Sequence, residues 1–178
     1  MAMAALSAQA TAFIVDAKAN SSTDGAGLST ISLAIGQSFS VLASATDLWS
    51  AGALPRYSNA DGLTANLYAT ASDESGKAPG TLMGQSFGLY TQNGFTAYYG
   101  QLVGRVGSQY FGLGTNSGGV ASSAGTLKLF YWDSNASDNT GSIAVSVTAV
   151  PEPETYAMLL AGLGLVGAIA RRRKQRKS

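Results

Sequence analysis

GTLKLFYWDSNASDNTGSIAVSVTAV, residues 125–150, consists of two apolar segments separated by a polar loop. In each segment a hydrophobic side chain stands at every second position. These positions are Leu127, Leu129 and Tyr131 in the first segment, and Ile143, Val145, Val147 and Ala149 in the second. A repeat of two places such side chains on one face of an extended strand. We therefore predict two half-buried antiparallel β-strands that are joined by the loop.

The same repeat occurs upstream, on either side of the dipeptide Gly36-Gln37. The alternating residues are Ile31, Leu33 and Ile35 before this predicted turn, and Phe39, Val41 and Ala43 after it. Clusters of Gly, Asn, Asp and Ser separate the segments, and no amphipathic helix is predicted between residues 13 and 150. The sequence predicts an all-β fold, an antiparallel jelly-roll or β-sandwich domain over residues 11–150. Residues 57–84 are the least regular part, predicted as a long excursion with one short strand at 67–70.

The 178-residue chain contains neither Cys nor His, which excludes several kinds of chemistry. It has no disulfide, no Cys/His zinc site and no Ser-His-Asp triad. The G-x-S-x-G pattern at residues 84–88 therefore lacks the histidine base of a nucleophile elbow. Two aspartates in the polar loop imitate a glycosidase pair, but that chemistry needs a defined separation across a substrate groove. The protein is predicted not to be an enzyme.

Charge is unevenly distributed along the chain. Residues 1–150 hold five basic and eight acidic side chains, whereas residues 151–178 hold six basic and two acidic ones. The predicted domain is therefore mildly acidic. Because nucleic-acid binding requires a clustered basic surface, no nucleic-acid partner is predicted.

The loop at residues 133–140 concentrates oxygen-bearing side chains. Asp133, Asn135 and Ser137 alternate, and Asp138 and Asn139 stand next to each other. Because Ca²⁺ takes about six to eight hard oxygen ligands, the loop is a candidate calcium site. Asp138 replaces the glycine that an EF-hand requires, so the loop is not an EF-hand. The alternative is an ordinary polar hairpin loop, because Asp, Asn and Ser are also common turn residues.

Three segments resemble the calcium-dependent galactose-binding bacterial lectins, a jelly-roll family: WSAG (49–52), YGQLVGRVG (99–107) and DSNASDNTGSIAVSV (133–147). The resemblance extends from residue 15 to residue 148, with a larger excursion at 53–97. It implies one Ca²⁺ bound by the side chains of Asp133, Asp138 and Asn139 and by the carbonyls of Asn135 and Ala51. It also implies that sugar hydroxyls complete the coordination and contact Asp133 and Asn139.

Four aromatic residues are candidates for stacking on the apolar face of a sugar. They are Tyr57, Tyr98, Tyr99 and Trp132. Strand alternation leaves Trp132 either in the core or on the surface of the sheet.

The C-terminal segment differs in character from the rest of the chain. Pro151-Glu152-Pro153 precedes an uncharged apolar run, and Arg171, Arg172 and Arg173 follow it. The order of these features resembles the PEP-CTERM sorting signal of Gram-negative bacteria, here residues 151–178. The resemblance implies export and processing near the Pro-Glu-Pro triplet by an exosortase-type transpeptidase. It also implies an association with exopolysaccharide and biofilm.

The same segment is predicted to anchor the protein transiently in the inner membrane. The predicted transmembrane helix spans 155–170, and the three arginines act as a stop that begins a basic tail at 171–178. After processing, the protein is expected at the cell surface or in the extracellular matrix. Ala8-Gln9-Ala10 matches a signal-peptidase pattern, so residues 1–10 are predicted to be the remnant of a truncated signal peptide. The alternative is an ordinary disordered N-terminus.

Two functions are compatible with these patterns. The first is an exported module that binds an extracellular polysaccharide or a galactose-like sugar through Ca²⁺. The alternative is a structural matrix or surface protein that uses the same sandwich without binding sugar. Open coordination positions on the ion, facing solvent, would distinguish the first function from the second.

Overall fold

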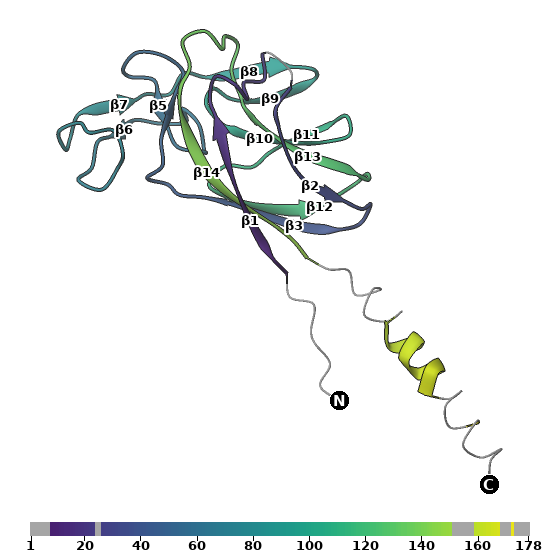
Figure 1. Ribbon diagram of the computed structural model, residues 1–178. Coiled ribbons are helices and arrows are strands. Elements are labelled where there is room, and N and C mark those ends of the chain that lie inside the picture. Colours follow the sequence, from purple (N-terminus) through teal and green to yellow (C-terminus); the bar gives the residue numbers. More distant parts are fainter. Residues whose placement is uncertain (1–7, 24–25, 151–158, 168–171, 173–178) are drawn as a thin grey trace.

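The computed structural model describes residues 8–23, 26–150, 159–167 and 172. Two antiparallel sheets pack against each other in it (Figure 1). The first sheet contains β1 (Ala10–Asp16), β3 (Ser38–Ala43), β12 (Asn116–Val120) and β14 (Thr140–Ala149), with the short strands β4 (Trp49–Ser50) and β5 (Tyr57–Ser58). The second sheet contains β2 (Leu28–Leu33), β10 (Leu102–Val106), β11 (Gln109–Gly112) and β13 (Gly125–Tyr131).

The long strands are connected as in a jelly roll. The first sheet has the order β12-β3-β14-β1 and the second has the order β11-β10-β13-β2. The chain crosses between the sheets from β1 to β2, from β2 to β3 and from β13 to β14, and β1 and β14 become neighbours. Double-sheet connectivity of this kind defines the jelly roll. The predicted all-β fold with a C-terminal helix is confirmed.

β14 pairs along both of its edges and thereby organises the first sheet. β1 pairs along one edge, and β3 followed by β4 pairs along the other. Between β3 and β4 the chain leaves the ladder, and the Asp47 carboxylate accepts the hydrogen bond of the Ala144 N–H instead. A side chain thus satisfies a backbone amide where no strand is present.

The core between the sheets is built from the alternating residues that the sequence indicates. Leu127, Leu129, Ile143, Val145 and Val147 are all buried. Trp49 and Tyr131 pack edge to face in this core, with ring centroids 4.6 Å apart.

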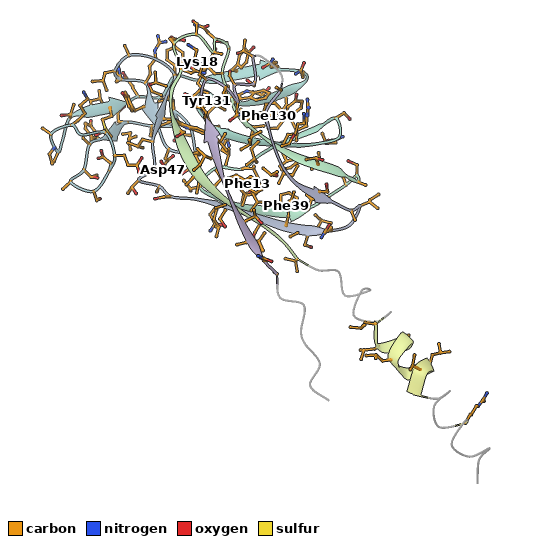
Figure 2. All side chains as sticks on the ribbon, in the orientation of Figure 1. Phe13, Lys18, Phe39, Asp47, Phe130 and Tyr131 are labelled. Atoms are coloured by element: carbon orange, nitrogen blue, oxygen red, sulfur yellow. The ribbon has the colours of Figure 1, made fainter. Side chains whose placement is uncertain are left out.

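β13 is half-buried as predicted up to Leu129, but its C-terminal end is buried on both faces. Phe130 and Trp132, on the face opposite Tyr131, have no exposed surface. The hairpin of β8 (Leu89–Gln92) and β9 (Phe95–Tyr98) covers this second face, and it contributes Phe95 to the aromatic cluster there. Figure 2 labels Phe130 and Tyr131, which follow each other in the sequence and belong to different clusters. An added layer of structure therefore buries aromatic residues that alternation alone leaves at the surface.

The predicted strand through Ile35 ends earlier in the structure. β2 ends at Leu33, and the Gln37 N–H donates to the Ala34 carbonyl (3.1 Å) across a turn in which Gly36 has a φ of 82°. Ile35 lies in this turn and is 67% exposed. The alternation therefore fails at Ile35 because the turn begins before it.

The excursion predicted at 53–97 contains β5 and two small hairpins. The first hairpin pairs β6 (Leu67–Tyr68) with β7 (Leu82–Gly84), and the second pairs β8 with β9. The short strand predicted at 67–70 is thus present as a two-residue strand. Figure 1 shows the hairpin of β6 and β7 to one side of the sandwich and that of β8 and β9 at one end.

The C-terminal segment contains a helix at residues 159–167. Among the described residues, no helix is long and apolar enough to cross a membrane. The predicted span of 155–170 lies only partly within them, and the predicted sorting triplet, Arg171 and Arg173 lie outside them. At the other end, residues 1–7 of the predicted signal-peptide remnant are outside as well, whereas Ala10 begins β1 and pairs with Thr148.

Candidate functional site

The loop between β13 and β14 is fixed by the segment that follows β1. The Asp133 N–H donates to Ser22 Oγ (3.0 Å), and the Asp133 carbonyl accepts from Ser22 Oγ (2.9 Å) and Thr23 Oγ1 (2.8 Å). Asp133 is only 4% exposed. The end of β13 is therefore held at a defined position, although the residues that hold it are more than a hundred positions away in the sequence.

The Asp133 carboxylate occupies an environment that disfavours its charge. Burial is the largest influence and raises the pKa of Asp133, and the nearby Asp138 carboxylate raises it further. The Ser134 N–H, which donates to Asp133 Oδ1 (2.7 Å), and the Asn139 amide act in the opposite direction. A buried carboxylate next to a second one gains most from a cation that balances both charges.

Asn139, next to the Asp133 carboxylate, has a side-chain oxygen without a hydrogen-bond donor in the described residues. Its side chain is 2% exposed, and its Nδ2 donates to the Ala17 carbonyl (3.1 Å). Its Oδ1 is buried and has no hydrogen-bond partner within the described part of the chain. Leaving a buried acceptor unpaired costs about 1–3 kcal/mol, so this oxygen is suited to a ligand that supplies positive charge or a donor.

The side chain of Asn135 organises the loop rather than facing a ligand. Its Oδ1 accepts from the N–H (3.1 Å) and the Oγ (2.8 Å) of Ser137, and its Nδ2 donates to Asp138 Oδ1 (2.8 Å). These bonds occupy the side chain, and the Asn135 carbonyl stays a predicted ligand.

The segment 49–52 reaches the loop because β4 pairs with the start of β14. Gly141, with a φ of 86°, permits this approach, since a Cβ on it would lie 3.0 Å from Trp49 Cα. Farther along, Asp138 Oδ2 lies 2.9 Å from the position of a Cβ on Gly52. Ala51, the residue before Gly52, is 4% exposed, and its N–H donates to the Arg56 carbonyl (3.1 Å). The structure thus brings the segment that contains Ala51 next to the loop that contains Asp138.

The negative charge of the site also affects the pKa of the Tyr131 phenol. Burial raises the pKa of this group well above its ordinary value, and the charges of Asp133 and Asp138 raise it further. Its hydroxyl is buried with no partner among the described residues. Asp133 and Asp138 are therefore both close enough to the buried Tyr131 hydroxyl to disfavour its ionisation.

The available donor set fits calcium better than a transition metal. Across the described residues, no group of three or more His, Cys, Asp or Glu side chains is placed to bind a metal ion. The site instead offers two carboxylates, an amide oxygen and backbone carbonyls. Hard oxygen donors of this kind are typical ligands of Ca²⁺.

The aromatic candidates differ in their accessibility. Trp132 is fully buried and its Nε1 donates to the Tyr90 carbonyl (2.9 Å), so its proposed role as a stacking surface is wrong. Tyr98 is exposed, and Tyr57 and Tyr99 are half-buried. These three tyrosines remain candidates.

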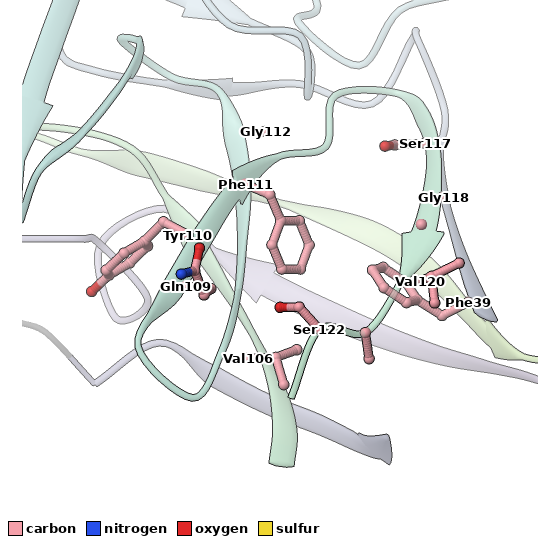
Figure 3. Close-up of a pocket in the computed structure, with 12 residues that line it drawn as sticks. Phe39, Val106, Gln109, Tyr110, Phe111, Gly112, Ser117, Gly118, Val120 and Ser122 are labelled. Atoms are coloured by element: carbon pink, nitrogen blue, oxygen red, sulfur yellow. The ribbon is translucent and has the colours of Figure 1, made fainter. Parts of the chain in front are cut away.

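Two cavities are lined by other residues than the side chains of the oxygen cluster. One, of about 300 Å³, lies between the edge strands β11 and β12, where Phe39 and Phe111 line it (Figure 3). The other, of about 340 Å³, is lined by residues that include Tyr57, Glu74 and Thr140. Neither cavity contains the side chains of Asp133 or Asn139.

Comparison with known proteins assigns the C-terminal segment. Residues 149–174 match the family model of the PEP-CTERM protein-sorting motif. This motif indicates an exported protein that is sorted by an exosortase. No curated protein matches the chain.

The domain is similar to a solved structure described as the N-terminal domain of EclA, a PllA-like lectin. The TM-score is 0.49 and the sequence identity is 22%, over 78% of this chain and 95% of that one. This similarity is too distant to transfer a ligand or the role of a residue.

Sequence reasoning did not identify the residues that position the site. Ser22 and Thr23 fix the backbone of Asp133, and the Ala17 carbonyl orients Asn139. Their only signal in the sequence is a polar stretch after the first strand, which is typical of any turn. Arg56, whose Cδ lies near Gly52, and Phe87, on which its guanidinium packs, were not identified either.

Proposed function

We propose that this chain is an exported, exosortase-sorted surface or matrix protein that binds carbohydrate through a calcium ion. Asp133, Asp138 and Asn139 would supply side-chain oxygens to the ion, and Asn135 and Ala51 would supply carbonyls. When bound, Ca²⁺ would balance the two carboxylates and offer open positions to sugar hydroxyls. Asp133 and Asn139 would also hydrogen-bond to those hydroxyls and orient the sugar.

One observation carries this proposal. The Asn139 Oδ1 is buried and unpartnered within the described residues, beside a carboxylate whose pKa is raised by burial. An ordinary hairpin loop would turn these groups toward water or pair them. A cation at this position would remove both costs together.

The association with exopolysaccharide or biofilm is proposed from the sorting motif. An exported protein with a sugar site would meet polysaccharide outside the cell. The inner membrane is proposed as a transient location during processing, through the apolar C-terminal run.

Thermal unfolding of the full chain tests the proposal. A ligand that binds only the folded state raises the melting temperature by mass action. We expect millimolar Ca²⁺ to raise it, and a monosaccharide to raise it further only when Ca²⁺ is present. A calcium shift without any sugar shift would favour a structural matrix protein, and no shift with either ligand would reject the site.

A further inference from the structure

Arg56 lies beside the candidate site, directly before β5. Its carbonyl accepts from the Ala51 N–H (3.1 Å) and Ser50 Oγ (3.2 Å), and Arg56 forms a β-bridge with Gly84. These contacts fix its backbone between the segment 49–52 and the end of β7. The backbone of Arg56 is therefore held in place beside the segment 49–52.

The aliphatic part of the Arg56 side chain passes close to Asp138. Its Cδ lies 3.7 Å from the position that a Cβ on Gly52 would occupy, and Asp138 Oδ2 lies 2.9 Å from the same position. Because Gly52 has no side chain, the two groups lie close together there. A cationic side chain thus passes beside the Asp138 carboxylate of the candidate site.

An aromatic pair from the excursion holds the guanidinium. The Arg56 Cζ lies 4.5 Å from the centroid of the Phe87 ring, within the range of a cation–π contact. Tyr99 supports Phe87 edge to face, with centroids 5.0 Å apart. Phe87 is 47% exposed, so this arrangement lies at the surface. The guanidinium is therefore positioned before any ligand arrives.

No described residue accepts a hydrogen bond from this guanidinium. Within the described part of the chain, the Arg56 side chain donates no hydrogen bond and forms no ion pair. Arg105 is also stacked on aromatic rings, but its guanidinium donates to the Tyr110 hydroxyl (2.9 Å). Of these two stacked arginines, Arg56 is the one whose guanidinium donates no hydrogen bond to the described residues.

We propose that Arg56 makes the calcium-loaded site prefer saccharides that carry a carboxylate, such as uronic acids. This inference rests on the proposed function and specifies the class of sugar. With Ca²⁺ bound, the charges of Asp133 and Asp138 are balanced, and Arg56 adds positive charge at the border of the site. A guanidinium pairs with a carboxylate through parallel hydrogen bonds, and these are stronger than bonds between neutral groups.

Matched sugars test this inference on the full chain with millimolar Ca²⁺. Calorimetry would compare galactose with galacturonate, glucose with glucuronate and mannose with mannuronate. We expect one uronate to bind roughly tenfold more tightly than its neutral partner, as one charge-assisted contact predicts. Arg56→Gln should remove this preference and leave the neutral sugar unchanged. Arg56→Lys should keep part of it, because charge remains without the planar donors.

Lys77→Gln is the control, because it removes the same charge from an exposed position in the same excursion. Lys77→Gln should leave the uronate preference intact. Free uronate also binds some Ca²⁺, and this effect is the same for all variants when they are compared at one calcium concentration. Equal weakening of both sugars in Arg56→Gln would overturn the inference, since Arg56 would then be structural. Calcium-dependent binding of neutral sugars without a uronate preference would also overturn it, while the proposed function would stand. Absence of binding by all six sugars would overturn both.

Discussion

At the scale of single residues, Asp133 determines whether the loop is a cation site or a polar turn. Hydrogen bonds from Ser22 and Thr23 fix the backbone from which its side chain extends. Its carboxylate is buried, and the Asp138 carboxylate disfavours its charge. The residue is therefore placed in advance for an ion, at a cost that the ion would offset.

We expect Asp133→Ala to abolish the calcium-dependent rise in melting temperature, because it removes the most buried carboxylate of the site. Asp73→Ala is the matched control. Asp73 accepts hydrogen bonds from Thr70 and Ser75 within a turn of the excursion, and the Ser75 hydroxyl is the main cause of its lowered pKa. Its loss should lower the melting temperature but leave the calcium response intact. Equal responses of the two variants in thermal unfolding would contradict the site.

The candidate residues of the loop could be predicted because they are contiguous. Asp133, Asp138 and Asn139 lie within one short segment, and their side-chain chemistry indicates a cation. The supporting contacts could not be predicted in this way, since the Asn139 amide reaches the Ala17 carbonyl across 122 positions. Only the pairing of β1 with β14 brings these two residues together.

At the scale of elements, β13 shows where periodicity is sufficient and where it fails. Leu127 and Leu129 are buried as their alternation predicts. Phe130 and Trp132 are also buried, because the hairpin of β8 and β9 covers the outer face of the second sheet. Periodicity shows which side chains share a face of one strand. It does not show which other elements of the fold cover that face.

This second buried face should contribute strongly to stability. We expect Phe130→Ala to cost about 3–5 kcal/mol of unfolding free energy, which is typical of a fully buried aromatic residue. Ile14→Ala, on β1, is the control, because Ile14 is 61% exposed and should cost less than about 1 kcal/mol. Denaturant unfolding of both variants measures the difference. Similar losses would mean that the hairpin does not cover β13 in solution.

The turn that contains Glu74 contacts the sandwich through a pair of carboxyl groups. The Asp47 charge is the main cause of the raised pKa of Glu74, and a hydrogen bond between the two side chains also raises it. A raised pKa means that the folded state holds the proton more tightly than the unfolded chain. The resulting stabilisation is present below the ordinary value of 4.5 and is lost as the pH rises through the folded-state value.

Glu74→Gln should therefore be more stable than the wild type at pH 7, because it removes the repulsion with Asp47. The difference should shrink at pH 3, where Glu74 of the wild type is protonated. Denaturant unfolding at the two pH values measures this change. The gain at pH 7 should also decrease with added salt, which screens exposed charges. A gain that is independent of both pH and salt would rule out the carboxyl pair as its cause.

At the scale of the whole molecule, the candidate site and the exit of the chain lie at opposite ends of β14. The strand begins at Thr140, next to the loop, and ends at Ala149. Ten strand residues span about 33 Å. The Val150 N–H donates to the Ser38 carbonyl (2.9 Å), so the hydrogen bonds of the domain extend to the residue just before the Pro-Glu-Pro triplet. Figure 1 shows the loop between β13 and β14 at the end of the sandwich away from this exit.

This arrangement predicts that processing near the sorting triplet separates the C-terminal segment without cutting the domain. In the native host, we expect the wild-type chain to be converted to a shorter form. Glu152→Ala should accumulate at full length, because it removes the carboxylate between the two prolines of the triplet. Glu154→Ala is the matched control, since it removes the same charge just after the triplet, and it should be processed normally. Gel mobility and the mass of the mature form distinguish these outcomes. Normal processing of both variants would mean that the transpeptidase does not recognise Glu152. A mature form that ends before Ala149 would mean that cleavage occurs within β14 and therefore within the domain.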